Sequence, residues 1–178
     1  AASVCYPFGY GLSYTTFALS DVRGGMNGAG EIALSATVTN TGLCAGKYVL
    51  QAYVNPPKGR IAKPATALVG FAKTRLLGPN ESETLTVSFA PYAFATYDDE
   101  GAVRKSAYVL EKGAYGFRVG ENVRETVNVD YRYELDDDAI LEQLSPKCAP
   151  TLLHRRMLAD GSYREIACAP ETPREDWR

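Results

Sequence analysis

The sequence has few of the residues that build common catalytic and metal sites. It contains one histidine, one tryptophan and four cysteines, which lie far apart at Cys5, Cys44, Cys148 and Cys168. Zinc sites take ligands from closely spaced pairs, and disulfide scaffolds need more cysteines in a shorter chain. We therefore expect free or half-buried thiols, with one disulfide as the alternative, and no bound metal or cofactor.

An excess of one charge and long apolar runs are also lacking. The 19 basic and 21 acidic residues give a formal charge of −2, and no basic run occurs. This argues against nucleic acid and anionic membranes as partners, because both need a concentrated positive face. No apolar stretch approaches the ~20 residues of a membrane-spanning helix. The start of the chain lacks the basic end and apolar core of a signal peptide and has no initiator methionine, so we expect a fragment or a processed piece.

What the sequence does contain is short segments that alternate between apolar and polar residues. In 31–40, for example, every second residue from Ile32 to Val38 is apolar, which predicts a strand with one buried face. Turn signals rich in glycine, asparagine and proline separate the segments. Strands are predicted near residues 14–22, 31–40, 47–54, 66–76, 82–90, 114–119 and 123–133. Seven short strands without alternating helices predict an all-β antiparallel sandwich of two sheets.

The end of the chain follows a different pattern. Residues 1–133 carry 13 basic and 11 acidic residues, whereas 134–178 carry 6 and 10. Asp136-Asp137-Asp138 can cap a helix, and the apolar residues at 140, 141 and 144 form a helical stripe that ends before Pro146. We predict a short helix over 136–145, followed by an extended segment that packs against something else.

The groups that could carry chemistry have simpler structural explanations. The acidic runs 98–100 and 136–138 are consecutive residues, which indicate a hairpin turn ending at Gly101 and a helix cap rather than a catalytic pair. His154 has no histidine or cysteine at ligand spacing. The glycines of 113–120 lie along a predicted strand and open no helix, so they predict no phosphate site. Asn80-Glu81-Ser82 fits a glycosylation acceptor, which matters only in a secreted eukaryotic protein.

Aromatic residues near the start are the remaining signal. Tyr6, Phe8, Tyr10, Tyr14 and Phe17 fall close together around proline and glycine residues. Such a cluster could stack on sugar rings, or it could pack against a neighbouring domain. We favour the second interpretation, and we take Phe8, Tyr10, Tyr14 and Phe17 as candidates for a domain interface or a sugar-facing surface.

These residues also carry a family resemblance. The segment 6–17, Tyr-Pro-Phe-Gly-Tyr-Gly-Leu-Ser-Tyr-Thr-Thr-Phe, resembles the lead into the fibronectin type III-like domain of glycoside hydrolase family 3 enzymes, mostly β-glucosidases. The resemblance covers about residues 6–131, with further matching segments at 38–42, 45–47, 51–54, 68–71 and 113–115. The turn Gly78-Pro79-Asn80-Glu81-Ser82 departs from the family's usual Pro-Gly-Glu-Ser. The resemblance implies a seven-stranded immunoglobulin/fibronectin III-like sandwich, with a short helical and extended tail.

Two further segments are similar to family members whose halves are swapped in order. The first comprises 97–101 and 105–113, and the second is 141–150, which resembles the connector to a catalytic barrel that follows this domain. In the family, the nucleophilic aspartate lies on that barrel and the acid/base glutamate usually lies on an α/β sandwich domain. Neither domain is in this chain, so no residue here is assigned a catalytic role. The resemblance implies that the whole enzyme hydrolyses β-linked glucosides by a retaining route.

The predicted organisation has three parts: residues 1–13 as the end of a preceding domain or linker, 14–133 as the sandwich, and 134–178 as a connector tail with a short helix. We expect a non-catalytic domain that supports the catalytic barrel and α/β sandwich domains of the same polypeptide. The alternatives are a carbohydrate-binding module that uses the aromatic cluster or the 55–66 loop on β-glucosides, and an adhesion sandwich. The resemblance to the swapped members favours the bacterial cytoplasm, with secretion as the alternative.

Overall fold

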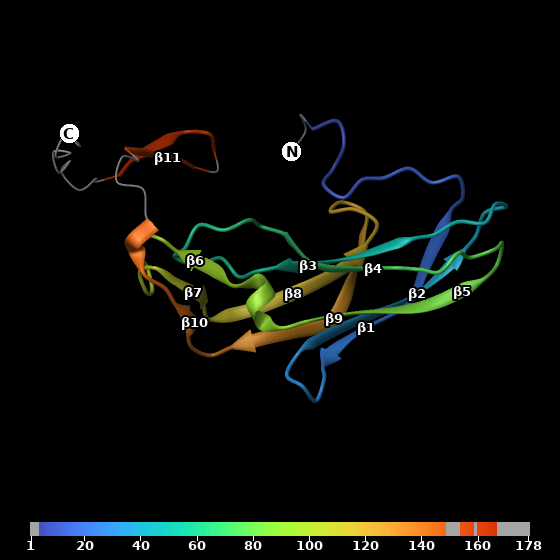
Figure 1. Cartoon of the computed structure of the whole chain (residues 1–178), viewed down its shortest axis with the longest axis horizontal. Helices are drawn as coiled ribbons and strands as arrows, with labels where there is room; N and C mark the ends of the chain where they lie inside the picture. Colours follow the sequence, from blue (N-terminus) through green and yellow to red (C-terminus); the bar gives the residue numbers. More distant parts are fainter. Residues whose placement is uncertain (1–3, 149–153, 159, 167–178) are drawn as a thin grey trace, which may run out of the picture. The chain divides into compact units, whose positions relative to one another are not determined.

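The computed structural model describes residues 4–148, 154–158 and 160–166 (Figure 1). The chain divides into two compact units, residues 1–143 and 144–178. The described part of the second unit holds the short 3-10 helix η2 (Pro146–Cys148) and a hairpin of β11 (Arg155–Met157) and β12 (Tyr163–Glu165). The larger first unit contains the sandwich.

Two antiparallel sheets form this sandwich. One has the strand order β1-β2-β5, and the other has the order β4-β3-β8-β9. The strands are β1 (Phe17–Met26), β2 (Ile32–Asn40), β3 (Val49–Asn55), β4 (Ala67–Lys73), β5 (Ser82–Phe89), β8 (Gly113–Gly120) and β9 (Thr126–Leu135). Each of the seven predicted strands therefore has a counterpart, and the all-β antiparallel prediction is confirmed.

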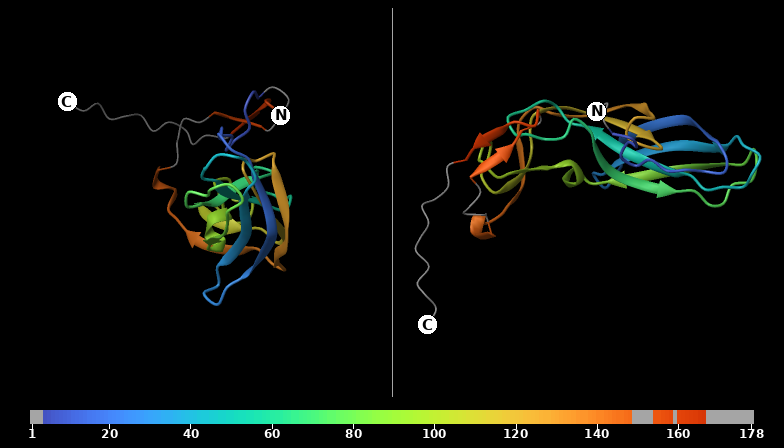
Figure 2. Two further views of the ribbon diagram at one scale, coloured as in Figure 1. Left: turned by 90° about the vertical axis from the view of Figure 1, so that its right-hand side faces the viewer. Right: turned by 90° about the horizontal axis from the view of Figure 1, so that it is seen from above.

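The core lies between the two sheets, as the alternation predicts. Along β2, the even-numbered residues are buried and the odd-numbered ones are partly exposed. They face apolar residues of β3 and β8, and the 3-10 helix η1 (Pro91–Phe94) adds the ring of Phe94. Burying an aliphatic or phenylalanine side chain of this kind contributes about 1.5–3 kcal/mol relative to exposure. In the end-on view of Figure 2, the strands of this unit surround a common interior.

A third, smaller sheet corrects one prediction. It has the order β10-β7-β6 and consists of β6 (Thr96–Asp98), β7 (Ala107–Leu110) and β10 (Ala139–Gln143). The helix predicted over 136–145 is therefore wrong. Residues 139–143 instead pair with the backbone of β7, and the Gln143 side chain donates to the carbonyls of Lys105 and Ser106. The apolar residues at 140 and 141 stay largely exposed. A helix here would therefore gain little from burying an apolar face, whereas the free edge of β7 offers backbone hydrogen bonds.

The outer faces of the two main sheets differ. On β2 and β5, hydroxyl groups pair across the strands, with 3.0 Å between the oxygens of Thr37 and Thr84 and 2.8 Å between those of Thr39 and Ser82. This face is polar and solvated. On β3, by contrast, the outward-facing Gln51 and Tyr53 are 8% and 0% exposed. The outer face of the β4-β3-β8-β9 sheet is therefore partly covered.

Candidate functional site

The N-terminal segment, residues 4–16, provides this cover. The Phe8 carbonyl accepts a hydrogen bond from the Val123 amide at 3.0 Å, and the Gly9 carbonyl accepts one from Gln51 Nε2 at 2.9 Å. The hydroxyl of Tyr53 donates to Gln51 Oε1 at 2.6 Å. Two buried side chains of β3 thus hold an irregular segment against the sheet.

This contact requires the glycine at position 9. The backbone of Gly9 has a φ of +82°, in the left-handed region that L residues rarely adopt. A Cβ atom there would lie 2.1 Å from Gln51 Oε1 and 2.7 Å from the Tyr53 hydroxyl. The glycine in the Phe-Gly-Tyr sequence therefore lets the segment approach the sheet closely.

Asn40 holds the other end of the segment. Its side chain is fully buried, and its Oδ1 accepts hydrogen bonds from the Thr15 hydroxyl at 2.7 Å and from the Gly42 amide at 3.1 Å. Its Nδ2 donates to the carbonyls of Cys44 and Leu77, both at 2.8 Å. One amide side chain therefore joins three stretches of chain. The sequence indicated only a turn at Asn40-Thr41-Gly42.

The anchored segment presents aromatic side chains to solvent. Phe8 and Tyr10 are largely exposed, Tyr14 is 100% exposed, and the neighbouring Leu12 is 90% exposed. Phe17 differs, because it lies in β1 and packs on Tyr48 with 5.3 Å between the ring centroids. Of the four candidate residues, three are thus exposed, and Phe17 packs against the core.

A groove of about 600 Å³ runs beside this segment. Its walls include Tyr10, Tyr48, Glu121 and Glu125. A hydrogen bond that Glu121 donates to the Glu125 carboxylate, together with burial, raises the pKa of Glu121, and the same bond lowers the pKa of Glu125. Sharing a hydrogen bond, these carboxyls are closer than the ~5 Å separation used in retaining glycoside hydrolysis. The pair therefore does not have the geometry of a glycosidase site.

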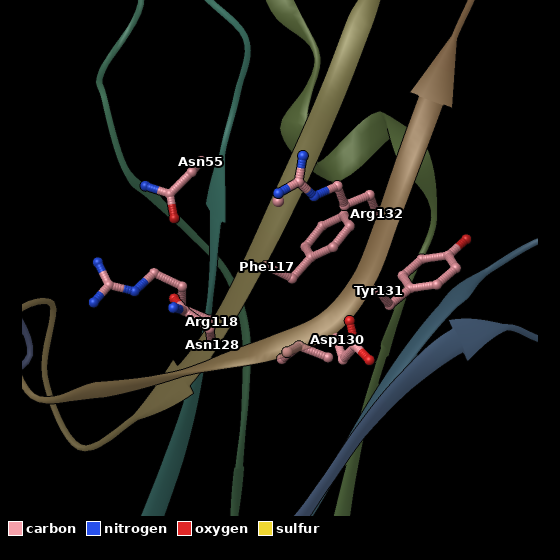
Figure 3. Close-up of a pocket in the computed structure, with 9 residues that line it drawn as sticks. Asn55, Phe117, Arg118, Asn128, Asp130, Tyr131 and Arg132 are labelled. Atoms are coloured by element: carbon pink, nitrogen blue, oxygen red, sulfur yellow. The ribbon is translucent and has the colours of Figure 1, made fainter.

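A second hollow, of about 660 Å³, lies on the same outer face of the β4-β3-β8-β9 sheet (Figure 3). Asn55, Arg118 and Arg132 contribute polar groups to its lining. Asn55 of β3 pairs with Gly116 of β8, which pairs with Arg132 of β9. Because the middle residue of this row has no side chain, a depression remains between its neighbours. No sequence pattern indicated this hollow, since it depends on the register of three strands.

Asp98 shows that one acidic cluster has a structural role. Its carboxylate is almost fully buried and accepts four backbone hydrogen bonds, from the amides of residues 101–104, at 2.7–3.0 Å. Burial alone would raise the pKa of Asp98, but the four amides outweigh it and lower the pKa. The 98–100 run begins the loop between β6 and β7, which continues past Gly101, where the φ is +86°, to residue 106, so the predicted end of the turn at Gly101 is too early.

Glu111 has a similar role in the 55–66 loop. Its buried carboxylate accepts hydrogen bonds from the amides of Arg60 at 2.6 Å and Ile61 at 3.2 Å, and it pairs with the ammonium of Lys63. Asp138, expected as a helix cap, instead accepts from the Lys112 amide at 2.9 Å and pairs with Arg60. The carboxylates of Glu111 and Asp138 therefore both hold this loop against the sandwich.

His154, the cysteines and the candidate metal ligands remain to be placed. The carbonyl of His154 accepts a hydrogen bond from Ile166 at 2.9 Å, within the second unit. Within residues 4–148, 154–158 and 160–166, no group of three or more histidine, cysteine or acidic side chains could hold a metal ion. Cys5 and Cys44 are free thiols, whereas Cys168 and the side chain of Cys148 lie outside what the structure describes. None of the helices in the described ranges is long and apolar enough to cross a membrane.

Comparison with known proteins agrees with this architecture. Residues 48–123 match the model of the fibronectin type III-like domain. With its two antiparallel sheets, the chain is a fibronectin type III-like β-sandwich.

The relatives show where such a domain occurs. The chain is 48% identical to β-glucosidase A of Butyrivibrio fibrisolvens, over 92% of this chain and 21% of that protein. It is 40% identical to the β-glucosidase of Ruminococcus albus, over 91% and 17%. The chain therefore spans about a fifth of the length of these relatives. It is an accessory domain of the glycoside hydrolase family 3 type.

Solved structures of β-glucosidases also match this chain over a small part of their length. The β-glucosidase from Paenibacillus barengoltzii matches with a TM-score of 0.76 and 41% identity, over 93% of this chain and 19% of that one. β-Glucosidase 3B from Thermotoga neapolitana matches with a TM-score of 0.66 and 36% identity, over 76% and 18%. In both, the matched region is a small part of a longer chain.

Proposed function

We propose that this domain supports the catalytic domains of a β-glucoside-hydrolysing family 3 enzyme and takes no part in the chemistry itself. The observation that carries the proposal is the N-terminal segment, whose aromatic side chains are exposed although its backbone is fixed at both ends. Its contact partners are the barrel and the α/β sandwich domain of the same polypeptide. We further propose the swapped order, in which the barrel follows residue 178.

The anchored segment suits a contact between domains for a physical reason. Burying an exposed aromatic side chain contributes about 1.5–3 kcal/mol. A flexible segment would lose conformational entropy on binding, and this loss would offset part of the gain. The N-terminal segment avoids most of this loss, because hydrogen bonds to Gln51, Val123 and Asn40 already hold it in place. The exposed rings of Phe8, Tyr10 and Tyr14 are thus a preorganised apolar surface.

This surface can be tested in the complete polypeptide that contains the domain. We expect the double variant Phe8→Ala/Tyr14→Ala to lower its melting temperature, because two buried contacts are lost, but to leave that of the 178-residue chain unchanged. Differential scanning calorimetry measures both. Met26→Ala, at the far end of β1 and 50% exposed, is the matched control. Equal melting temperatures of the double variant and the control in the complete polypeptide would contradict the proposal.

A carbohydrate-binding module is the second candidate function. It is favoured by the complete exposure of Tyr14 and by the rings of Tyr6 and Tyr10, whose centroids are 5.0 Å apart. These rings are tilted by 33° to each other and so form no flat platform for a sugar. The 55–66 loop, the other candidate, has its backbone amides at Arg60 and Ile61 occupied by Glu111.

The 178-residue chain by itself separates these functions. We expect it to fold, to show no turnover of an aryl β-glucoside, and to give no calorimetric signal with millimolar cello-oligosaccharides. Saturable binding that is lost in Tyr14→Ala would establish the carbohydrate-binding function instead. An inhibitor of family 3 β-glucosidases serves as the control for contamination. Turnover that this inhibitor leaves unchanged would point to a contaminant. Inhibitor-sensitive turnover by the pure chain would refute the supporting role.

A further inference from the structure

The hollow on the β4-β3-β8-β9 sheet has a polar lining that includes one buried donor without an internal partner. The Nε atom of Arg118 is buried and has no hydrogen-bond partner among the described residues. No ion pair involves Arg118 or Arg132 in the described ranges. A buried donor without an acceptor costs about 1–3 kcal/mol, so an acceptor that enters the hollow is favoured.

The shape of the hollow follows from strand register. Tyr53 of β3 pairs with Arg118, which pairs with Asn128 of β9, and the next row runs from Asn55 through Gly116 to Arg132. An ideal Cβ on Gly116 would meet nothing within 4 Å. In Figure 3, Asn55, Arg118 and Arg132 lie around this hollow, whereas the ring of Tyr131 points away from them.

The chemistry of this lining favours a carboxylate over a neutral sugar. Guanidinium groups form strong, charge-assisted hydrogen bonds with carboxylates. A sugar site needs an exposed aromatic face, but Phe117 is 2% exposed and stacks on Tyr131, with ring centroids 6.1 Å apart. Asp130, the one acidic residue of the lining, forms no ion pair with either arginine in the described ranges.

We propose that the hollow binds a carboxylate side chain of a neighbouring domain in the same polypeptide, through Arg118 and Arg132. The proposal rests on the supporting function and adds a polar contact to it. The position of the hollow favours this occupant, because it lies on the same side of the sheet as the N-terminal segment. Gln51 and Tyr53, which hold that segment, face the same side as Arg118. About four fifths of the length of each relative lies outside the matched segment and can supply the carboxylate.

The first test uses the 178-residue chain and sodium acetate as the probe. We expect acetate to shift the Nε–H resonance of Arg118 in nitrogen-15 NMR spectra, while sodium chloride at equal ionic strength and methyl β-D-glucopyranoside do not. Arg132→Gln should weaken the acetate response about tenfold, as expected for losing a charged hydrogen bond. Gly116→Val should abolish it by filling the hollow, and Arg23→Gln on β1 is the matched control. An equal response to chloride or to the glucoside would overturn the carboxylate assignment.

The second test uses the complete polypeptide. We expect Gly116→Val and Arg118→Gln to lower its melting temperature relative to Arg23→Gln, with no such loss in the 178-residue chain. If these variants match the control while Phe8→Ala/Tyr14→Ala still destabilises, the supporting function stands and the carboxylate contact is refuted. If only the hollow variants destabilise, the contact stands and the aromatic surface is refuted.

Discussion

Replacing Asn40 with alanine is expected to destabilise the folded domain by about 3–5 kcal/mol. The change removes four side-chain hydrogen bonds from a fully buried position. It also leaves the carbonyl of Leu77 without this donor in the protein interior, so the cost exceeds that of a single lost contact. Urea unfolding followed by circular dichroism measures the difference.

Asn27→Ala is the matched control for this prediction. The Asn27 side chain also forms several hydrogen bonds, to the amides of Ala29 and Glu31 and to the Glu31 carboxylate, but it lies in the β1–β2 hairpin where water can replace them. We expect a loss of about 1 kcal/mol there. If Asn40→Ala cost no more than the control, Asn40 would not be the group that joins the three stretches of chain.

Replacing Glu111 with glutamine is expected to cost about 3–5 kcal/mol. The side chain of Glu111 is 3% exposed and that of Lys63 is 8% exposed, so the change leaves a buried ammonium without its counter-charge. The double variant Glu111→Gln/Lys63→Met removes both charges and should lose less than Glu111→Gln alone. Urea unfolding of the unmodified domain, Glu111→Gln, Lys63→Met and the double variant gives the coupling energy, and additive losses would contradict the pairing.

The same pair predicts how stability depends on pH. Burial alone would raise the pKa of Glu111, but Lys63 and the loop amides outweigh it and lower the pKa below the ordinary value. The stabilisation is therefore complete above the unfolded pKa of about 4.3 and is lost as pH falls through the lower folded pKa. Glu111→Gln should consequently unfold with a shallower pH dependence in this acidic range than the unmodified domain, and an unchanged slope would contradict the assignment.

The sandwich could be predicted from sequence because burial of one strand face leaves a period of two. Residues 32–38 show this alternation, and β2 buries the side chains that it indicates. The prediction failed at 136–145, where the structure has a strand in place of the predicted helix. The three aspartates and the three apolar residues of this segment are compatible with either element. The edge of β7 supplies backbone partners to residues 139–143, and this edge depends on contacts far apart in the chain.

The candidate site was predictable only in part. A cluster of aromatic residues beside glycines is visible in the sequence, but whether each ring is buried is not. Phe17 continues into β1 and packs on Tyr48, whereas Tyr14, three residues earlier, is fully exposed. The roles of Asn40 and Glu111 were missed, because a polar residue at a turn has the same sequence pattern whether it is solvated or buried.

By itself, the sequence determined the all-β class, the approximate positions of seven strands, the lack of a metal-ligand pattern, and a resemblance to an accessory domain of family 3 enzymes. These depend on local periodicity and on motifs, which a single chain displays directly. Tertiary structure alone decided which aromatic rings face solvent, which polar side chains fix the N-terminal segment, and where Gly116, paired with Arg132 and Asn55, leaves a hollow. These features depend on strand register and on contacts between distant residues, which local sequence does not encode.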